Sequence, residues 1–167
     1  MSIFHTFLMT TNRTTNEIVD VLAENLPFVE YVTTEEDLIP RANKWKSITT
    51  TNKVMNFTVL DGGTGQKRYE KVLGFRPDVT LIFDMRKDDE RYKAGKAQVL
   101  YTSVWMLQYF PGDAVLEIDE VIAMHRKDGN IFLSSKAREI GYLTDVDLAN
   151  FTLPYEWAEL LESVYME

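Results

Sequence analysis

The stretch DVTLIFDMR at residues 78–86 constrains the fold more than any other part of the sequence. Its apolar residues Val79, Leu81, Phe83 and Met85 stand at every second position, and successive side chains of a strand point to opposite faces of a sheet. The alternation therefore predicts a strand with one apolar face. We expect this strand to be central in a sheet.

A long helix pattern follows that strand directly. Asp88 and Asp89 supply an N-cap and an acidic first turn, and Pro111 with Gly112 stops the helix. Apolar residues with i, i+3, i+4 and i+7 spacing form one stripe along it, namely Ala94, Ala97, Leu100, Tyr101, Val104, Leu107 and Phe110. The sequence therefore predicts a helix from about residue 88 to Phe110 that covers the sheet.

Further elements are predicted on both sides of this pair. Thr14 followed by Glu17 fits a capping box that starts a helix, and Pro27 ends that helix. Asp128-Gly129 between two apolar runs predicts a tight hairpin. Strands are predicted at residues 3–9, 28–33, 47–60 (one or two strands), 114–118, 121–125 and 131–133, with a helical turn at residues 33–40.

The last segment is predicted to be a short helix of residues 155–164. Its Trp157, Leu160, Leu161 and Val164 would face inward, and Glu156, Glu159 and Glu162 would face outward. The sequence contains no repeat and no linker. We therefore predict one α+β domain over residues 1–167, a mainly antiparallel sheet packed against one long central helix, with shorter N- and C-terminal helices.

The net charge of −8 is concentrated in the C-terminal part of the chain. Residues 99–167 hold four Lys and Arg against twelve Asp and Glu, and no Lys or Arg follows Arg138. Such a field repels nucleic acid and anionic membranes, and it speeds the encounter with a basic protein. The charge distribution therefore predicts a protein partner with a basic surface, no nucleic acid and no membrane.

The glycine-rich stretch DGGTGQKR at residues 61–68 lacks the spacing of a phosphate-binding loop. A Walker loop needs a Ser or Thr directly after its lysine, and here Arg68 follows Lys67. The dinucleotide pattern Gly-x-Gly-x-x-Gly fails too, because Arg68 stands where the third glycine belongs. We interpret the stretch as a flexible surface connection.

Residues suited to catalysis or metal binding are few. The chain has two histidines, His5 and His125, both in predicted strands, and it has no cysteine. Asp84, Asp88 and Asp89 would suit a hard cation, although the Lys and Arg residues interleaved with them favour a solvated helix start. We predict no cofactor, no metal and no catalytic residue, and keep a metal-dependent enzyme with these three carboxylates as an alternative.

The segment after Arg138 combines seven acidic residues with several aromatic residues. Specific protein interfaces use aromatic side chains for buried area and charged side chains for fast capture and discrimination. The predicted partner-binding residues are Asp145, Asp147, Tyr155, Glu156, Glu159 and Glu162. The alternative is a solvated acidic helix face whose aromatic residues belong to the core.

One family resemblance covers residues 74 to about 135. It rests on GFRPDVTLIF from Gly74, the long helix, FPGDAVL from Phe110 and RKDG from Arg126. This pattern resembles that of a family of bacterial swarming-inhibition toxin immunity proteins. The chain departs from it at Ile118-Asp119-Glu120, where family members tend to place an Asn-Gly turn, and the carboxylates make this hairpin tip more acidic.

The resemblance implies a small cytoplasmic protein that protects its producer by binding and blocking a cognate polymorphic toxin. It brings no catalytic residues with it. The N-terminal MSIFHTFLMTTNR lacks the features of a secretory signal, in agreement with a cytoplasmic location. We therefore predict a non-enzymatic immunity protein that neutralises its toxin by stoichiometric, electrostatically assisted binding. The alternatives are the metal-dependent enzyme above and an adaptor or scaffold subunit without a toxin.

Overall fold

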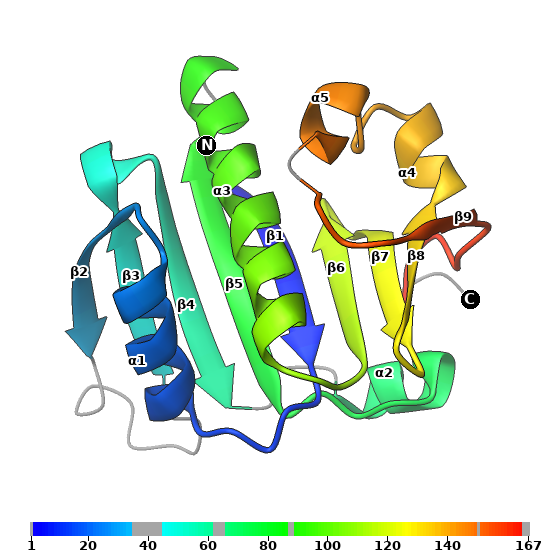
Figure 1. Cartoon of the computed structure of the whole chain (residues 1–167), viewed down its shortest axis with the longest axis horizontal. Helices are drawn as coiled ribbons and strands as arrows, with labels where there is room; N and C mark the ends of the chain where they lie inside the picture. Colours follow the sequence, from blue (N-terminus) through cyan, green and yellow to red (C-terminus); the bar gives the residue numbers. More distant parts are fainter. Residues whose placement is uncertain (1, 35–44, 62–65, 87–88, 150, 165–167) are drawn as a thin grey trace.

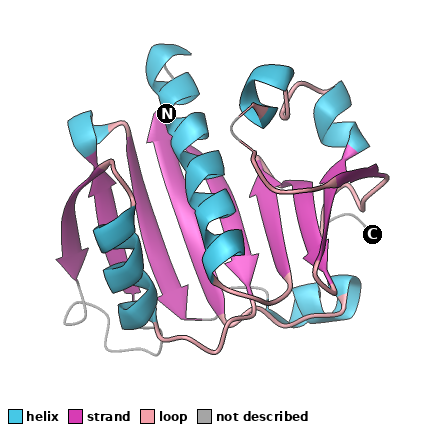
Figure 2. Cartoon of the chain, viewed as in Figure 1, coloured by secondary structure: helices cyan, strands magenta, loops and turns pink. Residues whose placement is uncertain are grey.

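The computed structural model describes residues 2–34, 45–61, 66–86, 89–149 and 151–164. Its elements are β1 (Ser2–Met9), α1 (Thr15–Asn25), β2 (Val29–Thr34), β3 (Trp45–Thr50), the 3₁₀ turn η1 (Thr51–Lys53), β4 (Met55–Asp61), α2 (Gln66–Leu73), β5 (Val79–Arg86), α3 (Asp89–Tyr109), β6 (Ala114–Ile118), β7 (Val121–Lys127), β8 (Asn130–Ser134), α4 (Ser135–Glu139), α5 (Asp145–Leu148) and β9 (Glu156–Ala158). Within these residues nine strands form one sheet (Figure 2).

The strand order in the sheet is β2-β3-β4-β5-β1-β6-β7-β8-β9. All neighbouring strands are antiparallel except β8 and β9, which are parallel. Strand β5 lies between β4 and β1, and its Val79, Leu81, Phe83 and Met85 are buried. The predicted interior strand and the α+β class with one long helix, α3, are therefore confirmed.

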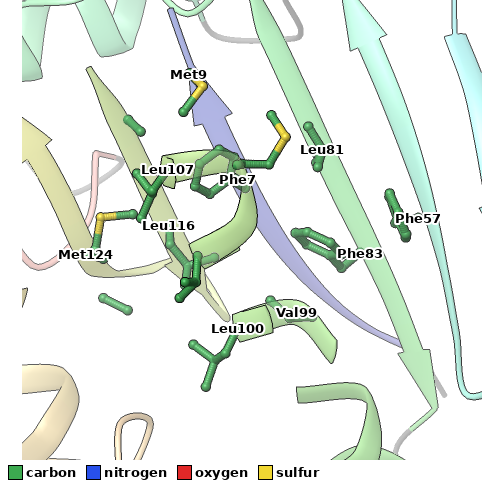
Figure 3. Packing of buried hydrophobic residues seen from close by; sticks show 14 of the residues in the cluster. Phe7, Met9, Phe57, Leu81, Phe83, Val99, Leu100, Leu107, Leu116 and Met124 are labelled. Atoms are coloured by element: carbon green, nitrogen blue, oxygen red, sulfur yellow. The ribbon is translucent and has the colours of Figure 1, made fainter. Parts of the chain in front are cut away.

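The main core lies between the sheet and the two longest helices. Figure 1 shows α1 and α3 on the same face of the sheet. Strand β1 points Phe7 and Met9 to this face, where they share one core with Leu100 and Leu107 of α3, and Figure 3 shows Phe7 beside Leu107. Burial of one Phe or Leu side chain stabilises a fold by about 1.5–3 kcal/mol, so this core holds the long helix on the sheet.

A second, smaller core lies on the opposite face of the sheet. Leu8 of β1 and Val115 of β6 point to it, since neighbouring residues of a strand face opposite ways. Tyr69 of α2 and Val164 near the C-terminus cover these two residues. Elements from two distant parts of the sequence therefore close this face.

The interpretation of the glycine-rich stretch as a flexible connection is wrong for residues 66–68, because these residues form the first turn of helix α2. Residues 66–73 are helical, whereas residues 62–65 lie outside the described residues. The sequence QKRYEKVL is mostly polar, and Tyr69 is the buried residue of this helix. One buried position in eight residues gives no apolar period, so the pattern did not reveal the helix.

The buried face of α3 agrees only in part with the predicted stripe. Leu100, Val104, Leu107 and Phe110 are buried as predicted, whereas Ala94, Ala97 and Tyr101 are exposed. The face also includes Gly95, Val99, Thr102, Ser103 and Met106. A Cβ atom on Gly95 would lie 2.8 Å from Met85 Sδ, so helix and sheet approach closely there. The residue of α3 at this close approach is a glycine, and a prediction based on larger apolar side chains does not identify it.

The predicted helix of residues 155–164 is wrong. Its first part forms β9, which pairs with β8, and the described residues after β9 form no regular element. Trp157 packs on the main core and Val164 on the second core, so the chain passes round the outer strand of the sheet. The C-terminal helices are α4 and α5, which begin at the capping side chains of Ser134 and Thr144.

The other local predictions are mostly confirmed. Thr14 Oγ1 accepts a hydrogen bond from Glu17 N at 3.2 Å, and α1 ends before Pro27. Asp128 and Gly129 have φ angles of 51° and 82°, the left-handed values that a two-residue hairpin turn requires. Of the predicted helical turn at residues 33–40, the first two residues belong to β2 and residues 35–40 lie outside the described residues.

Candidate partner-binding surface

The segment from Tyr142 to Val164 wraps one end of the sheet (Figure 1). Tyr155 and Trp157 pack on the main core, and Leu160 and Val164 pack on the second core. The backbone anchors the far end, where Ile122 N donates to Glu162 O at 2.9 Å. The predicted partner-binding residues therefore lie on an extended wrap and not on one helix face.

Tyr155 belongs to a row of aromatic rings along this segment. Its ring centroid lies 5.6 Å from that of Phe151 and 5.7 Å from that of Trp157, both in edge-to-face geometry. The guanidinium carbon of Arg138 lies 4.8 Å from the Trp157 ring centre. Such contacts hold each ring in one orientation, so Tyr155 presents a half-buried, rigid surface.

Four of the predicted acidic residues carry exposed carboxylates. The Asp145 side chain is 92% exposed and lies 3.8 Å from Arg138, an exposed pair that is worth little. Glu156, Glu159 and Glu162 are exposed, and none has a cationic side chain within 4.0 Å among the described residues. These three carboxylates therefore add uncompensated negative charge to the surface.

Asp147 has a different environment. Lys96 Nζ lies 3.0 Å from Asp147 Oδ2, and Thr144 donates to the same oxygen from its backbone N and its hydroxyl, each at 2.8 Å. Burial raises the pKa of Asp147, but the hydrogen bonds from Thr144 and the charge of Lys96 outweigh it and leave the pKa lowered. This carboxylate is occupied by internal contacts, which a partner would have to displace.

The predicted residues do not share one face. Asp145 lies in α5 on the side of the main core, Glu156 lies on the outer strand, and Glu162 lies in the stretch that reaches the second core. Their role in partner binding stays a prediction.

A cavity of about 400 Å³ opens beside Tyr155 and Glu156. Its wall includes Arg126, whose guanidinium donates to the carbonyls of Leu107, Phe110 and Gly112 at 2.6, 2.6 and 2.7 Å. Burial lowers the pKa of Arg126, although Asp113 acts in the opposite direction. Arg126 satisfies carbonyls at the C-terminal end of α3, so we assign it a structural role.

A second cavity of about 410 Å³ lies between α3 and α5, and sequence reasoning missed it. Tyr92, Lys96 and Ala97 of α3 form one wall, and Val146 and Asp147 of α5 form the other. Its residues come from segments about fifty positions apart, and no local motif joins them. The family resemblance singled out the acidic Asp119-Glu120 turn in the sequence, but this turn does not line the cavity.

Of the three carboxylates proposed for a metal-dependent enzyme, Asp84, Asp88 and Asp89, the structure describes the side chain of Asp84. Asp84 lies on β5 and points away from the α3 face, because Phe83 and Met85 beside it point towards that face. Asp88 and the side chain of Asp89 lie outside the described residues. In the part of the chain that the structure describes, no group of three or more His, Asp and Glu is arranged to hold a metal ion.

Both histidines lie in strands, as predicted, and both are buried. His125 packs beside Phe75 on the second core, with ring centroids 5.9 Å apart. Burial lowers its pKa most, against an opposing effect of Asp113. His125 therefore fills the second core as a neutral side chain.

Comparison with known proteins identifies the family of this chain. No curated protein and no solved structure matches it. None of the helices that the structure describes has the length and hydrophobicity needed to cross a bilayer. The family model described as SitI3-like matches residues 3–139, which run from β1 to the end of α4 and stop before the six predicted partner-binding residues. The chain therefore belongs to the SitI3-like family.

Proposed function

We propose that this chain is an immunity protein that neutralises a cognate bacterial toxin by stoichiometric binding in the cytoplasm, without catalysis of its own. Membership of the SitI3-like family, matched over residues 3–139, is the observation that carries the proposal. The family suggests protection from a toxin. The sequence has no cysteine, so a thiolate nucleophile is excluded.

The surface charge supports a basic partner. Glu156, Glu159 and Glu162 are exposed without a cation within 4.0 Å among the described residues, and they follow the last basic residue of the chain, Arg138. Uncompensated rim charges raise the rate of association more than they lower the rate of dissociation. We propose that these glutamates guide the toxin towards the wrap, with Tyr155 as a rigid aromatic contact.

The family match ends before this surface begins. A fold shared over residues 3–139 with a partner-specific segment beyond it would let related immunity proteins recognise different toxins on one scaffold. We therefore propose that residues 3–139 form the common scaffold and that the wrap determines which toxin is bound.

The first test is co-expression with the product of the adjacent open reading frame. A one-to-one complex that survives affinity purification and size exclusion, together with rescue of cells that express that product, supports the proposal. An adaptor subunit would bind other proteins and give no rescue. If the neighbouring product is not toxic, or is toxic and unaffected by this chain, the proposal is wrong.

The second test removes three charges from the proposed surface. The variant Glu156→Gln/Glu159→Gln/Glu162→Gln should slow association with the toxin by about ten-fold at low ionic strength and leave dissociation nearly unchanged. A matched control is Asp20→Asn/Glu24→Gln/Glu30→Gln, which removes three exposed acids from α1 and β2. Equal association rates for the two variants would place the contact elsewhere.

A further inference from the structure

The outer face of helix α3 carries apolar and aromatic residues where a surface helix normally carries charge. From Ala97 to Tyr109 the helix contains no charged residue, although charged residues make up 26% of the chain. The inner face packs on the main core, and the outer face leaves Tyr101 42% and Tyr109 55% exposed. A helix that is apolar all round is normally buried, so the outer face of α3 is a candidate contact surface.

The residues of this face form one ridge. Lys93, Ala97, Tyr101, Trp105 and Tyr109 follow one another at intervals of four, and side chains four positions apart are neighbours on a helix surface. All five side chains are exposed or half-buried. Ridges with this spacing interlock in the commonest class of helix packing, in which the two axes cross at about 50°. We call these five residues the α3 ridge.

The C-terminal end of the α3 ridge is aromatic and rigid. Trp105 and Tyr109 stack with 4.7 Å between ring centroids and 15° between ring planes. The buried Phe110 supports both rings edge to face, at 6.4 and 4.9 Å. Aromatic rings that are fixed before binding lose little conformational freedom in a contact. This end of the ridge is therefore a preformed projection.

The N-terminal end of the α3 ridge borders a hollow. Lys93 and Ala97 line the cavity of about 410 Å³ between α3 and α5. Across the cavity lies Val146, which at 78% is the most exposed large apolar side chain among the described residues. In the same part of the chain no carboxylate lies within 4.0 Å of the Lys93 ammonium. This end offers a small residue, an apolar wall and a cation.

The two ends of the ridge complement each other. When a second copy lays its ridge antiparallel on the first, with Tyr101 at the common centre, Trp105 of one copy meets Ala97 of the other. Tyr109 then meets Lys93, because both pairs stand at equal distances from Tyr101 in the sequence. The first contact places a large ring against a small residue, and the second places a cation beside an aromatic ring. A two-fold axis forms each contact twice.

Charge restricts where two copies of this chain can meet. The net charge of −8 makes the copies repel each other, whereas the α3 ridge has one cation and no carboxylate. We propose that the α3 ridge is a self-association surface, on which two copies pack antiparallel with the Trp105–Tyr109 pair of each in the α3–α5 cavity of the other. Neither Tyr155 nor the three glutamates proposed to guide the toxin line this cavity. The inference therefore goes beyond the proposed function and does not rest on it.

Sedimentation equilibrium of the isolated chain measures this association directly. The mean mass should rise from 19.4 kDa towards twice that value as the protein concentration increases from about 1 μM to about 500 μM, because one helix ridge is a small interface. The contact is apolar and both copies are acidic. Association should therefore strengthen between about 50 mM and about 500 mM NaCl, whereas a contact made by ion pairs would weaken.

Two variants change the ridge at exposed positions. Ala97→Glu places a carboxylate in the proposed contact, and Tyr109→Ser removes the projecting ring. Each should raise the dissociation constant of the dimer by about ten-fold or more. The matched control is Val72→Glu, because Val72 is 39% exposed on α2, which covers the opposite face of the sheet. This control should dimerise like the wild type.

A single cysteine tests the register of the two helices. The natural chain has no cysteine, so Tyr101→Cys introduces one thiol per copy. Because residue 101 lies on the proposed two-fold axis, mild oxidation should link two copies through a disulfide, whereas Val72→Cys should stay unlinked. The inference is overturned by a chain that stays monomeric, by a dimer that Ala97→Glu and Tyr109→Ser leave intact, or by a Tyr101→Cys chain that cross-links no faster than Val72→Cys.

The toxin is the competing occupant of the ridge. If the chain is monomeric and Ala97→Glu weakens its binding to the neighbouring gene product, the toxin covers the ridge. That result overturns self-association and leaves the immunity proposal standing. A wild type that dimerises through the ridge and binds no toxin supports the inference and overturns the immunity proposal.

Discussion

Lys96 Nζ lies 3.0 Å from Asp147 Oδ2, and both side chains are largely buried, 9% and 15% exposed. This ion pair joins the long helix α3 to the four-residue helix α5, none of whose residues is fully buried. A helix this short is not stable without tertiary contacts. The Lys96–Asp147 pair therefore fixes the start of the C-terminal wrap on the scaffold.

Loss of Lys96 should destabilise the protein strongly. Lys96→Met leaves the buried Asp147 carboxylate without its cation, and breaking a buried pair in this way costs about 3–5 kcal/mol in other proteins. We expect a loss of unfolding free energy in that range by urea denaturation. Arg13→Met is the control, because both side chains of the Arg13–Glu17 pair are at least half exposed and the pair should contribute less than about 0.5 kcal/mol.

Protonation of Asp147 at low pH should remove the stabilisation that the Lys96–Asp147 pair provides. Its pKa is lowered in the folded protein, so the folded state binds the proton less tightly than the unfolded chain does. The stabilisation is therefore present above the unfolded pKa near 3.8 and is lost as the pH falls through the lower folded value. The stability difference between the wild type and Asp147→Asn should shrink over this window in urea titrations. A difference that stays constant down to the acid transition would contradict the pairing.

Arg126 should be among the least replaceable residues outside the apolar core. Arg126→Met removes the donors to the buried carbonyls of Leu107 and Phe110 and to the partly buried carbonyl of Gly112. Each orphaned carbonyl costs about 1–3 kcal/mol, so the variant should lose about 3 kcal/mol or more. Hydrogen exchange should show earlier opening of the last turn of α3. Lys127→Met, at the exposed neighbouring position, should change stability by less than about 0.5 kcal/mol.

Local signals predicted the fold wherever neighbouring residues decide the structure. Strand β5 is specified by its own alternating apolar residues, and the hairpin turn is specified by Asp128-Gly129 itself. Both were predicted correctly. Helix α2 and strand β9 depend on distant partners. Tyr69 is buried because Leu8 and Val115 lie beneath it, and Glu156 is in a strand because β8 offers an unpaired edge. No pattern within a short window contains these partners.

The candidate sites also depend on contacts between residues that are distant in the sequence, here contacts between charged and polar side chains. The sequence identified the excess of acids after Arg138, but the helix that would have gathered them on one face does not form. The ion pair in the wall of the cavity between α3 and α5 joins Lys96 to Asp147, which are far apart in the sequence. Composition measures how much charge a chain carries, and only the order of strands determines which charges meet.

Gly112 should tolerate no side chain. Its φ angle is 138°, and a Cβ atom there would lie 1.9 Å from the backbone oxygen of Thr10. Gly112→Ala should therefore force apart the connections next to α3 and β1, at a cost of about 3 kcal/mol or more. Gly129→Ala is the control, since its φ is 82° and nothing lies within 4 Å of the added Cβ. That variant should lose only about 1–2 kcal/mol by thermal denaturation, through backbone strain alone.

Glu117 should make the protein less stable as the pH rises towards neutrality. It is 4% exposed on the second core, and burial raises its pKa to about 7, although the hydrogen bond from Tyr69 acts in the opposite direction. The folded state therefore binds this proton more tightly than the unfolded chain, whose pKa is near 4.5. The contribution to stability is fully present below pH 4.5 and is lost as the pH rises through about 7.

Glu117→Gln should remove this dependence, because its amide oxygen can still accept from Tyr69 and never becomes charged. A shift from 4.5 to about 7 corresponds to about 3 kcal/mol, so the variant should be more stable than the wild type by roughly that amount at pH 8 and by little at pH 4. Glu120→Gln removes the nearby charge that raises the pKa of Glu117, so it should shift the transition to lower pH. Urea titrations between pH 4 and 8 measure both effects. Parallel stability curves for the wild type and Glu117→Gln would show that Glu117 keeps an ordinary pKa.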